Sequence, residues 1–188
     1  HTFNKDTYDA SLGWEYNEAT ANFSTNINNY VSSVNEKRYV SGLFFEVDRA
    51  YENGGILSVS SRYDNVSDFD SKVSSRIGYA YNNYRASYSQ GYRLPTLYEM
   101  YGIDSYGYKG NPNLTAEDID SYEIGYRLGS FDTAIFYIEE SNAITYDNQT
   151  YTNVEEGGSS KGVELSYTKE VYGVDLASNI TYTDAKLN

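Results

Sequence analysis

Tyrosine is the residue type in this sequence most able to contact a ligand, and it is concentrated in one stretch. The chain contains 23 Tyr against seven Phe and one Trp, and residues 92–120 hold a dense set of them with both prolines and the only Met. Loop tyrosines offer rigid apolar area beside a polar hydroxyl. We therefore predict an elaborated loop whose candidate ligand-binding residues are Arg93, Tyr98, Tyr101, Tyr106, Tyr108, Asn111 and Asn113.

Some of these candidates also have a structural interpretation. Arg93 could pair with a carboxylate, and Pro95, two residues later, could end a strand. Asn111-Pro112-Asn113 could form a rigid turn that restarts the next strand. Both interpretations stay open on the sequence alone, so the tyrosines are the stronger candidates for ligand contact.

A second group of side chains could bind a cation. Asp64, Asp68 and Asp70 supply, with Asn65, the oxygen ligands that Ca²⁺ prefers, and they lie close together in the sequence. The alternative is that they are solvated loop carboxylates. The sequence indicates no other cofactor.

Catalytic chemistry has few possible participants. The chain has no Cys, which excludes disulfides and thiolate metal sites, and its one His is His1. A Ser-His-Asp triad or a zinc site with several His ligands is therefore not expected. The adjacent pair Glu139-Glu140 could not act together in a strand, because neighbouring side chains point to opposite faces. We expect a protein that is not an enzyme.

Composition narrows the class further. The net charge of −13 argues against a nucleic-acid partner. No apolar run approaches the ~18 residues of a membrane helix. The mean hydropathy of −0.65 is typical of soluble proteins but uninformative for a β-barrel, whose lumen is polar. No signal peptide is visible, which predicts a mature chain or a fragment.

Alternating apolar and polar residues predict the strands that must position these side chains. The pattern is clearest in residues 7–16, where every second residue is apolar or aromatic: Tyr8, Ala10, Leu12, Trp14 and Tyr16. We expect a tight turn at Asn17-Glu18 and a polar link over residues 29–37. About ten strands are predicted, at residues 7–16, 19–28, 39–48, 57–64, 72–81, 84–89, 122–128, 133–139, 162–167 and 174–183.

The predicted connections alternate in length. Short ones fall near Asn17, Asn53, Asn83, Gly129 and Glu170, and long ones near Val34, Asp68, Ile103 and Thr150. Without helices between the strands, this order predicts an all-β, antiparallel up-and-down meander. An outer-membrane barrel keeps short turns at one end and long loops at the other, whereas a soluble sandwich or β-solenoid, the alternatives, has no reason to do so.

The polar face of the predicted strands carries charges of both signs, as in Glu15, Arg62, Arg85 and Glu123. Such a face suits a wide lumen that holds water or a plug domain. Tyrosines on the strands are expected to form girdles at the membrane interfaces. These are Tyr8, Tyr16, Tyr39, Tyr63, Tyr81, Tyr84 and Tyr126.

Three short motifs lie in and after the tyrosine-rich stretch: Tyr92-Arg93-Leu94-Pro95, Asn111-Pro112-Asn113-Leu114, and Ser121-Tyr122-Glu123-Ile124-Gly125. In combination they resemble TonB-dependent outer-membrane receptors. In that family an aromatic-Arg-x-Pro motif ends one barrel strand, an Asn-Pro-Asn/Asp-Leu motif precedes the next, and that strand has an S-x-E-x-G pattern. The resemblance covers residues 39–186.

This resemblance implies a location and a role. Residues 1–188 would be a partial β-barrel domain in the bacterial outer membrane, about ten strands of a 22-stranded barrel without its plug domain and remaining strands. The receptor would take up a scarce nutrient with energy from the TonB system, acting through the plug. Spacing and loop style are most similar to the vitamin B12 (cobalamin) transporter and colicin-receptor subgroup, so cobalamin is favoured, with a ferric siderophore as the alternative.

The resemblance also implies partners: outer-membrane lipid, TonB, the small-molecule nutrient, and colicin or phage. Haem is disfavoured, because haem receptors carry a histidine between the two proline motifs and this chain has none there. One function from another class stays open, a soluble β-rich adhesion or carbohydrate-binding module.

Overall fold

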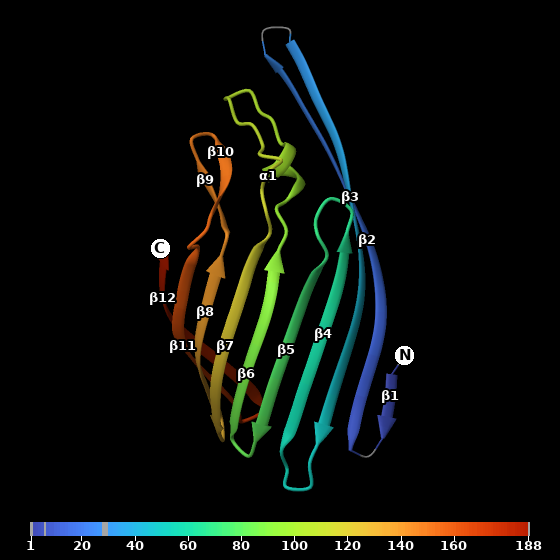
Figure 1. The fold of residues 1–188 in the computed structure, drawn as a ribbon. Helices are drawn as coiled ribbons and strands as arrows, with labels where there is room; N and C mark the ends of the chain where they lie inside the picture. Colours follow the sequence, from blue (N-terminus) through green and yellow to red (C-terminus); the bar gives the residue numbers. More distant parts are fainter. Residues whose placement is uncertain (1, 6, 28–29, 188) are drawn as a thin grey trace.

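The computed structural model describes residues 2–5, 7–27 and 30–187. In this part of the chain, ten strands form one sheet, β9 and β10 form a separate hairpin, and α1 is a single short helix (Figure 1). None of the described helices is long and apolar enough to cross a membrane. The elements are β1 (Thr2–Lys5), β2 (Tyr8–Ile27), β3 (Tyr30–Ala50), β4 (Ile56–Val66), β5 (Lys72–Tyr81), β6 (Tyr84–Arg93), α1 (Leu97–Tyr101), β7 (Glu117–Leu128), β8 (Phe131–Ser141), β9 (Ala143–Asp147), β10 (Thr150–Val154), β11 (Gly158–Val171) and β12 (Val174–Leu187).

Each strand of the sheet pairs antiparallel with the next one along the chain. The exception is that β8 pairs with β11, because the β9–β10 hairpin rises from the connection between them. The predicted antiparallel up-and-down meander is confirmed.

The predicted turn at Asn17-Glu18 is wrong. Asn17 pairs with Val40 and Glu18 with Tyr39, inside a ribbon in which β2 has 20 residues and β3 has 21. Most of the expected polar link over residues 29–37 is likewise strand β3. Past Tyr16 the apolar residues of β2 change face, from even positions up to Tyr16 to odd positions at Ala19, Ala21 and Phe23. This shift of the alternation within one continuous strand is what suggests a turn in the sequence.

The connections divide between the two ends of the sheet, as expected. Short turns at one end lie near Asn53, Asn83 and Gly129, and the last lies at Tyr172-Gly173 rather than Glu170. At the other end lie the long β2–β3 ribbon and the connections after β4, β6 and β8 (Figure 1).

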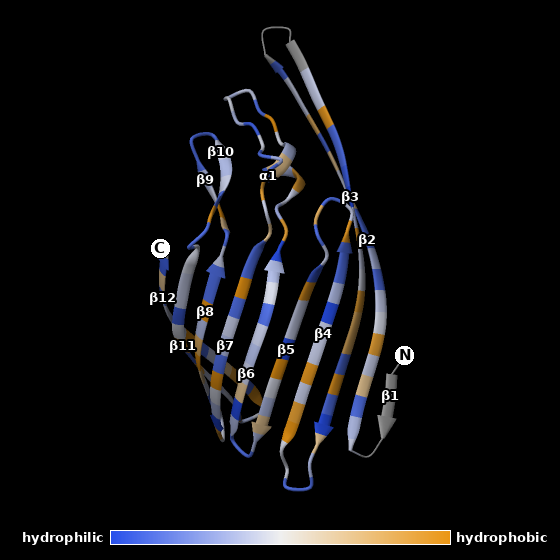
Figure 2. Cartoon of the chain, viewed as in Figure 1, coloured by the Kyte–Doolittle hydropathy of each residue, from blue (hydrophilic) through white to orange (hydrophobic). Residues whose placement is uncertain are grey.

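Hydrophobic and hydrophilic residues alternate along the strands (Figure 2), and the exposed apolar side chains gather on one face, which we call the outer face. Trp14 is 65% exposed and Ile124 66%. Further exposed side chains of this kind are Leu12, Leu43, Phe45, Tyr63, Val73, Ile77, Tyr79, Ile135, Val163, Leu165 and Ile180. A continuous apolar surface of this extent needs an apolar partner, and period-two strands present such a surface to lipid.

The inner face is polar and ion-paired. Arg62 on β4 binds Glu15 on β2 at 2.7 Å, and Arg85 on β6 binds Glu123 on β7 at 3.0 Å. Glycine makes room for these large side chains, since a Cβ at Gly42 would lie 2.3 Å from the Arg62 guanidinium. The mixed charges predicted for a wide lumen therefore face one another across strands.

The tyrosines predicted for interfacial girdles lie on the outer face. The rings of Trp14, Tyr16 and Tyr39 stack in sequence at 6.3 and 6.2 Å, and Tyr84 packs on Tyr126 with centroids 4.8 Å apart. Above Tyr39 the outer side chains of the β2–β3 ribbon turn polar, as at Lys37, which pairs with Glu18 at 3.0 Å. This change marks where the ribbon leaves the apolar band.

Candidate functional site

Two segments at the long-loop end pack together into a structure that we call the cap. It consists of residues 94–116, which join β6 to β7, and residues 142–157, which contain β9 and β10. Pro95, in the first segment, is less than 2% exposed. Most buried hydrophobic side chains of the described chain also lie here: Leu97, Met100, Tyr108, Leu114, Ala116 and Ala143. The core of this chain therefore sits in the cap and not in the ten-stranded sheet, which we call the wall.

The start of α1 is set by a capping box. The Thr96 hydroxyl accepts a hydrogen bond from the Glu99 backbone N–H at 3.1 Å, and the Glu99 carboxylate accepts one from the Thr96 N–H at 2.6 Å. This reciprocal pair satisfies donors that a helix start leaves free. Pro95 fixes the extended entry, so the sequence Pro-Thr-x-x-Glu encodes the helix directly after β6.

The cap crosses the mouth of the sheet. α1 follows β6 closely in sequence, yet it contacts β3 and β2, which lie three and four places away in the strand order. Its partners there include Arg38 on β3 and Phe23 on β2. Arg38 shares a strand face with Gly42, beside which Arg62 and Asp64 lie. The cap therefore packs on the continuation of the inner face.

Arg38 is the centre of this contact. Its guanidinium donates to both oxygens of Asp68 at 2.9–3.0 Å, to the carbonyl oxygen of Pro95 at 2.5 Å, and to the sulfur of Met100 at 3.1 Å. The guanidinium also lies 4.9 Å from the ring centroid of Phe69. Arg38 is only 7% exposed. The buried Arg38 guanidinium therefore links β3, the β4–β5 connection and the cap.

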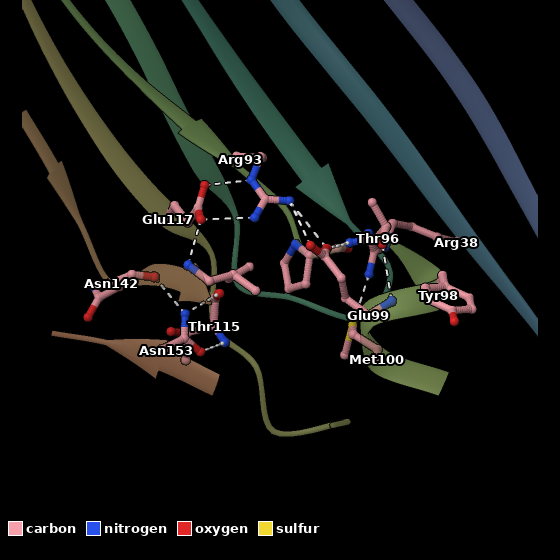
Figure 3. Close-up of polar contacts among 12 residues, drawn as sticks. Arg38, Arg93, Thr96, Tyr98, Glu99, Met100, Thr115, Glu117, Asn142 and Asn153 are labelled. Atoms are coloured by element: carbon pink, nitrogen blue, oxygen red, sulfur yellow. Dashed lines mark hydrogen bonds and ion pairs between the residues drawn. The ribbon is translucent and has the colours of Figure 1, made fainter. Parts of the chain in front are cut away.

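A second arginine fastens the cap to the wall (Figure 3). Arg93, at the end of β6, binds Glu117, at the start of β7, at 2.5 and 2.9 Å, and binds Glu99 of α1 at 3.2 Å. Glu117 also accepts from the Ile144 backbone N–H of β9 at 2.6 Å. Arg93 thus connects α1, β7 and the β9–β10 hairpin.

Four aromatic rings of the cap and one of β2 form a contiguous cluster, which we call the aromatic platform: Tyr98, Tyr108, Tyr146 and Tyr151, with Phe23 of β2. The Tyr98 and Tyr108 rings stack at 4.8 Å, Tyr98 meets Phe23 edge-on at 5.6 Å, and Tyr146 meets Tyr151 edge-on at 5.1 Å. Tyr98 is 43% and Tyr146 57% exposed. The platform therefore has a buried centre and two accessible ends.

The loop after α1 presents one tyrosine to solvent. The Asp104 carboxylate accepts from the backbone N–H groups of Tyr106 and Tyr108 at 2.8 and 3.0 Å, which closes the loop. Gly107, between them, has a φ of 101°, a conformation that favours glycine. Tyr106 is 89% exposed at the tip.

Asparagines tie the two cap segments together. Asn111 donates to the Tyr151 carbonyl oxygen at 2.9 Å and accepts from the Asn113 N–H at 3.0 Å. Asn153 accepts from the Thr115 N–H at 2.8 Å and donates to the Asn142 carbonyl oxygen at 2.7 Å (Figure 3). These bonds make residues 94–116 and 142–157 a single packed unit.

The seven predicted ligand-binding residues differ in exposure and in the bonds that they make within the chain. Tyr98, Tyr106 and Asn113 are exposed, and Tyr101 is half-buried. Arg93 and Asn111 are engaged in the internal bonds described above. Ligand contact stays a prediction for all of them, and the geometry supports Tyr98 and Tyr106 most directly.

Tyr108 differs from its neighbours because it is buried. It is 5% exposed, and its hydroxyl donates to the Tyr98 carbonyl oxygen at 2.6 Å. Burial raises the pKa of the Tyr108 hydroxyl well above its ordinary value. The phenol therefore stays protonated at neutral pH and acts as a structural donor.

The three predicted calcium ligands do not converge. Asp64 binds Arg62 at 2.8 Å and accepts from the Tyr92 hydroxyl at 2.8 Å on the inner face, while Asp68 binds Arg38. Asp70 is exposed in the β4–β5 connection. Among the described residues, no group of three or more His, Cys, Asp or Glu is arranged to hold a metal. Calcium binding at these aspartates stays a prediction without geometric support.

Three residues that hold the site together, Arg38, Glu117 and Asn153, are not among those predicted from the sequence. Arg38 falls between the expected polar link over residues 29–37 and the strand predicted at 39–48, Glu117 falls within residues 92–120, and Asn153 is near the long connection expected around Thr150. No local pattern distinguishes them, because most of their partners are 24 to 62 residues away. Burial was the missing information.

What this arrangement can do is bind rather than react. It offers exposed aromatic rings on a braced cap, at the mouth of a sheet with a polar inner face. A family profile described as TonB dependent receptor-like, beta-barrel matches residues 1–188. The chain belongs to the TonB-dependent receptor family. It comprises a stretch of the barrel wall together with the cap.

The receptor barrel is similar to several solved structures. The siderophore receptor PirA from Pseudomonas aeruginosa matches with a TM-score of 0.77 and 19% identity, over 99% of this chain and 38% of that one. A ferric enterobactin receptor from the same organism, solved with enterobactin, matches with a TM-score of 0.72 and 16% identity, over 97% and 34%. The copper transporter OprC gives 0.73 and 13%, over 99% and 36%.

At these identities the likeness is one of fold, and this chain spans a little over a third of the length of PirA. No curated protein sequence matches the chain. Membership of the TonB-dependent receptor family agrees with the predictions of a bacterial outer-membrane location and of a protein that is not an enzyme. It disfavours the soluble adhesion or carbohydrate-binding module.

Proposed function

We propose that this chain is part of a receptor that takes up a ferric siderophore or a related metal complex across the outer membrane. The observation that carries the proposal is the cap, which packs on the inner face of the β2–β3 ribbon at the mouth of the barrel. A ligand entering from outside meets the exposed rings of Tyr98, Tyr106 and Tyr146 first. The fold shared with siderophore and copper receptors supports this substrate class.

The residues of this chain would hold the ligand and perform no reaction. Arg38 and Arg93 keep the cap in place, and the aromatic platform supplies contact area. Energy from the TonB system would enter through a plug domain on the inner face, where Arg62 and Arg85 pair with carboxylates. The outer face would contact outer-membrane lipid.

Cobalamin uptake and colicin or phage binding are narrower proposals. The similar structures reported above are siderophore and copper receptors, so they favour a metal complex over cobalamin. Cobalamin is therefore the comparison ligand in the test.

Uptake into cells tests the proposal. Cells that lack their own siderophore and cobalamin receptors would express the complete receptor and be offered radiolabelled ferric siderophores or cobalamin, with and without TonB. We expect TonB-dependent iron uptake. Replacing residues 97–109 with a Gly-Ser linker should abolish it, whereas replacing the turn at residues 51–55 should not. Cobalamin uptake without iron uptake would contradict the proposal, as would uptake independent of TonB.

A further inference from the structure

The charge of the cap carries information about its ligand. Residues 94–116 and 142–157 contain five carboxylates and a single basic side chain, Lys109. The β4–β5 connection beside the cap adds Asp70 and also Asp68, whose charge is offset by Arg38 as that of Glu99 is by Arg93. The surface around the aromatic platform is therefore predominantly negative.

The arginines nearest the platform offer no free positive charge. Arg38 is buried, and its guanidinium is engaged by Asp68, the Pro95 carbonyl oxygen and Met100. Arg93 is engaged by Glu117 and Glu99. A site for an anion needs donors and positive charge that are available to it. Here both guanidiniums are used to hold the cap together.

Carboxylates lie close to the accessible ends of the platform. Asp147 is exposed and follows Tyr146 directly, and its carboxylate accepts only from the Asn148 side chain among the described contacts. At the other end, burial and then the negative charge of Asp104 raise the pKa of Tyr98. Aromatic faces attract cations through their quadrupoles, so rings and carboxylates favour the same kind of ligand.

We infer that the aromatic platform accepts a metal complex with an apolar face and a neutral or positive net charge, in preference to an anionic complex. Exposed Tyr98 and Tyr146 contact the apolar face, and the surrounding carboxylates repel anions. This inference rests on the proposed uptake function and names the ligand class of the same site. A neutral or cationic ferric tris-hydroxamate fits this description, and a trianionic ferric tris-catecholate does not.

Electrostatic selection at such a mouth acts on encounter as well as on the bound state. Like charges across an interface slow association and weaken binding, and salt reduces both effects. Discrimination between the two complexes should therefore be largest at low ionic strength.

Calorimetry on the complete purified receptor tests the inference. We expect the neutral and cationic tris-hydroxamates to bind at least about tenfold more tightly than the tris-catecholate at low salt, with a smaller ratio at high salt. Asp147→Lys should reduce that ratio roughly threefold or more. Glu52→Lys makes the same charge change in the exposed turn at the opposite end of the sheet and should leave the ratio unchanged.

Tyr146→Ala separates ring contact from charge. It should weaken binding of the tris-hydroxamates roughly threefold or more without changing the salt dependence. Tighter binding of the tris-catecholate, unaffected by Asp147→Lys, would overturn the inference and leave the uptake function standing. Binding of neither class of complex, with no iron uptake in cells, would overturn both.

Discussion

The wall and the cap use the same residue types in opposite ways. On the wall, tyrosines such as Tyr63 and Tyr84 face outward and remain exposed, whereas in the cap Tyr108 is 5% exposed and donates to a backbone carbonyl oxygen. Arg62 on the wall pairs across strands at 29% side-chain exposure, whereas Arg38 is buried at the centre of three segments. The wall depends on lipid to cover its apolar side chains, while the cap builds its own core. The two regions should therefore fail in different ways.

Removing Arg38 should have the largest effect. Arg38→Ala leaves the Asp68 carboxylate and the Pro95 carbonyl oxygen without their donor, and breaking a buried pair of this kind costs about 3–5 kcal/mol. We expect faster amide hydrogen exchange in residues 67–70 and 95–102 with the wall unchanged. Arg62→Ala is the matched control, since Asp64 keeps the Tyr92 hydroxyl. Equal protection of the cap in both variants would show that Arg38 does not hold it.

A charge on the outer face should affect the wall and spare the cap. Ile124→Arg places a guanidinium on the lipid-facing surface, which costs about 2–4 kcal/mol near the bilayer midplane. The expected result is a lower urea midpoint for unfolding of the barrel in lipid. Tyr106→Arg, at the exposed cap tip, should leave that midpoint unchanged. A drop with both variants would contradict the separation of the two regions.

Glycines offer the finest comparison. A Cβ at Gly110 would lie 2.5 Å from the Met100 carbonyl group, which is backbone, whereas a Cβ at Gly42 meets the movable end of the Arg62 side chain. Gly110→Ala should cost about 1–3 kcal/mol by displacing α1, and Gly42→Ala considerably less. Limited proteolysis within residues 97–109 would measure the difference. Comparable cleavage rates for the two variants would contradict the claim that Gly110 is packed more tightly than Gly42.

The wall could be predicted from the sequence because its signal is local. In β3, as in most strands, every second residue from Leu43 to Val47 is apolar and lies on the outer face. Most strands and most turn positions can therefore be predicted from this two-residue alternation. The prediction failed at Asn17, where the strand continues past the apolar band and its apolar side chains move from the outer to the inner face. Strand length above the membrane is set by pairing between β2 and β3, which alternation does not encode.

The cap could be predicted only in part. The motifs around Arg93 and Asn111 located it, and the exposure of Tyr98 and Tyr106 agrees with their loop positions. Tyr108 could not be distinguished from them, because its burial depends on Tyr98, Tyr146 and Tyr151 closing around it. Contacts between segments 40 residues apart leave no trace in a local pattern.

The packing of α1 against the β2–β3 ribbon also constrains the order of folding. Arg38 bonds to Pro95 and Met100, which lie 57 and 62 positions after it in the chain. Asn111 bonds to Tyr151, which lies 40 positions after Asn111. Contacts that close such long loops form late. Residues 94–116 can reach their place only after a hairpin before them and a hairpin after them are both present. Protease resistance of this segment would therefore report that the β9–β10 hairpin has formed.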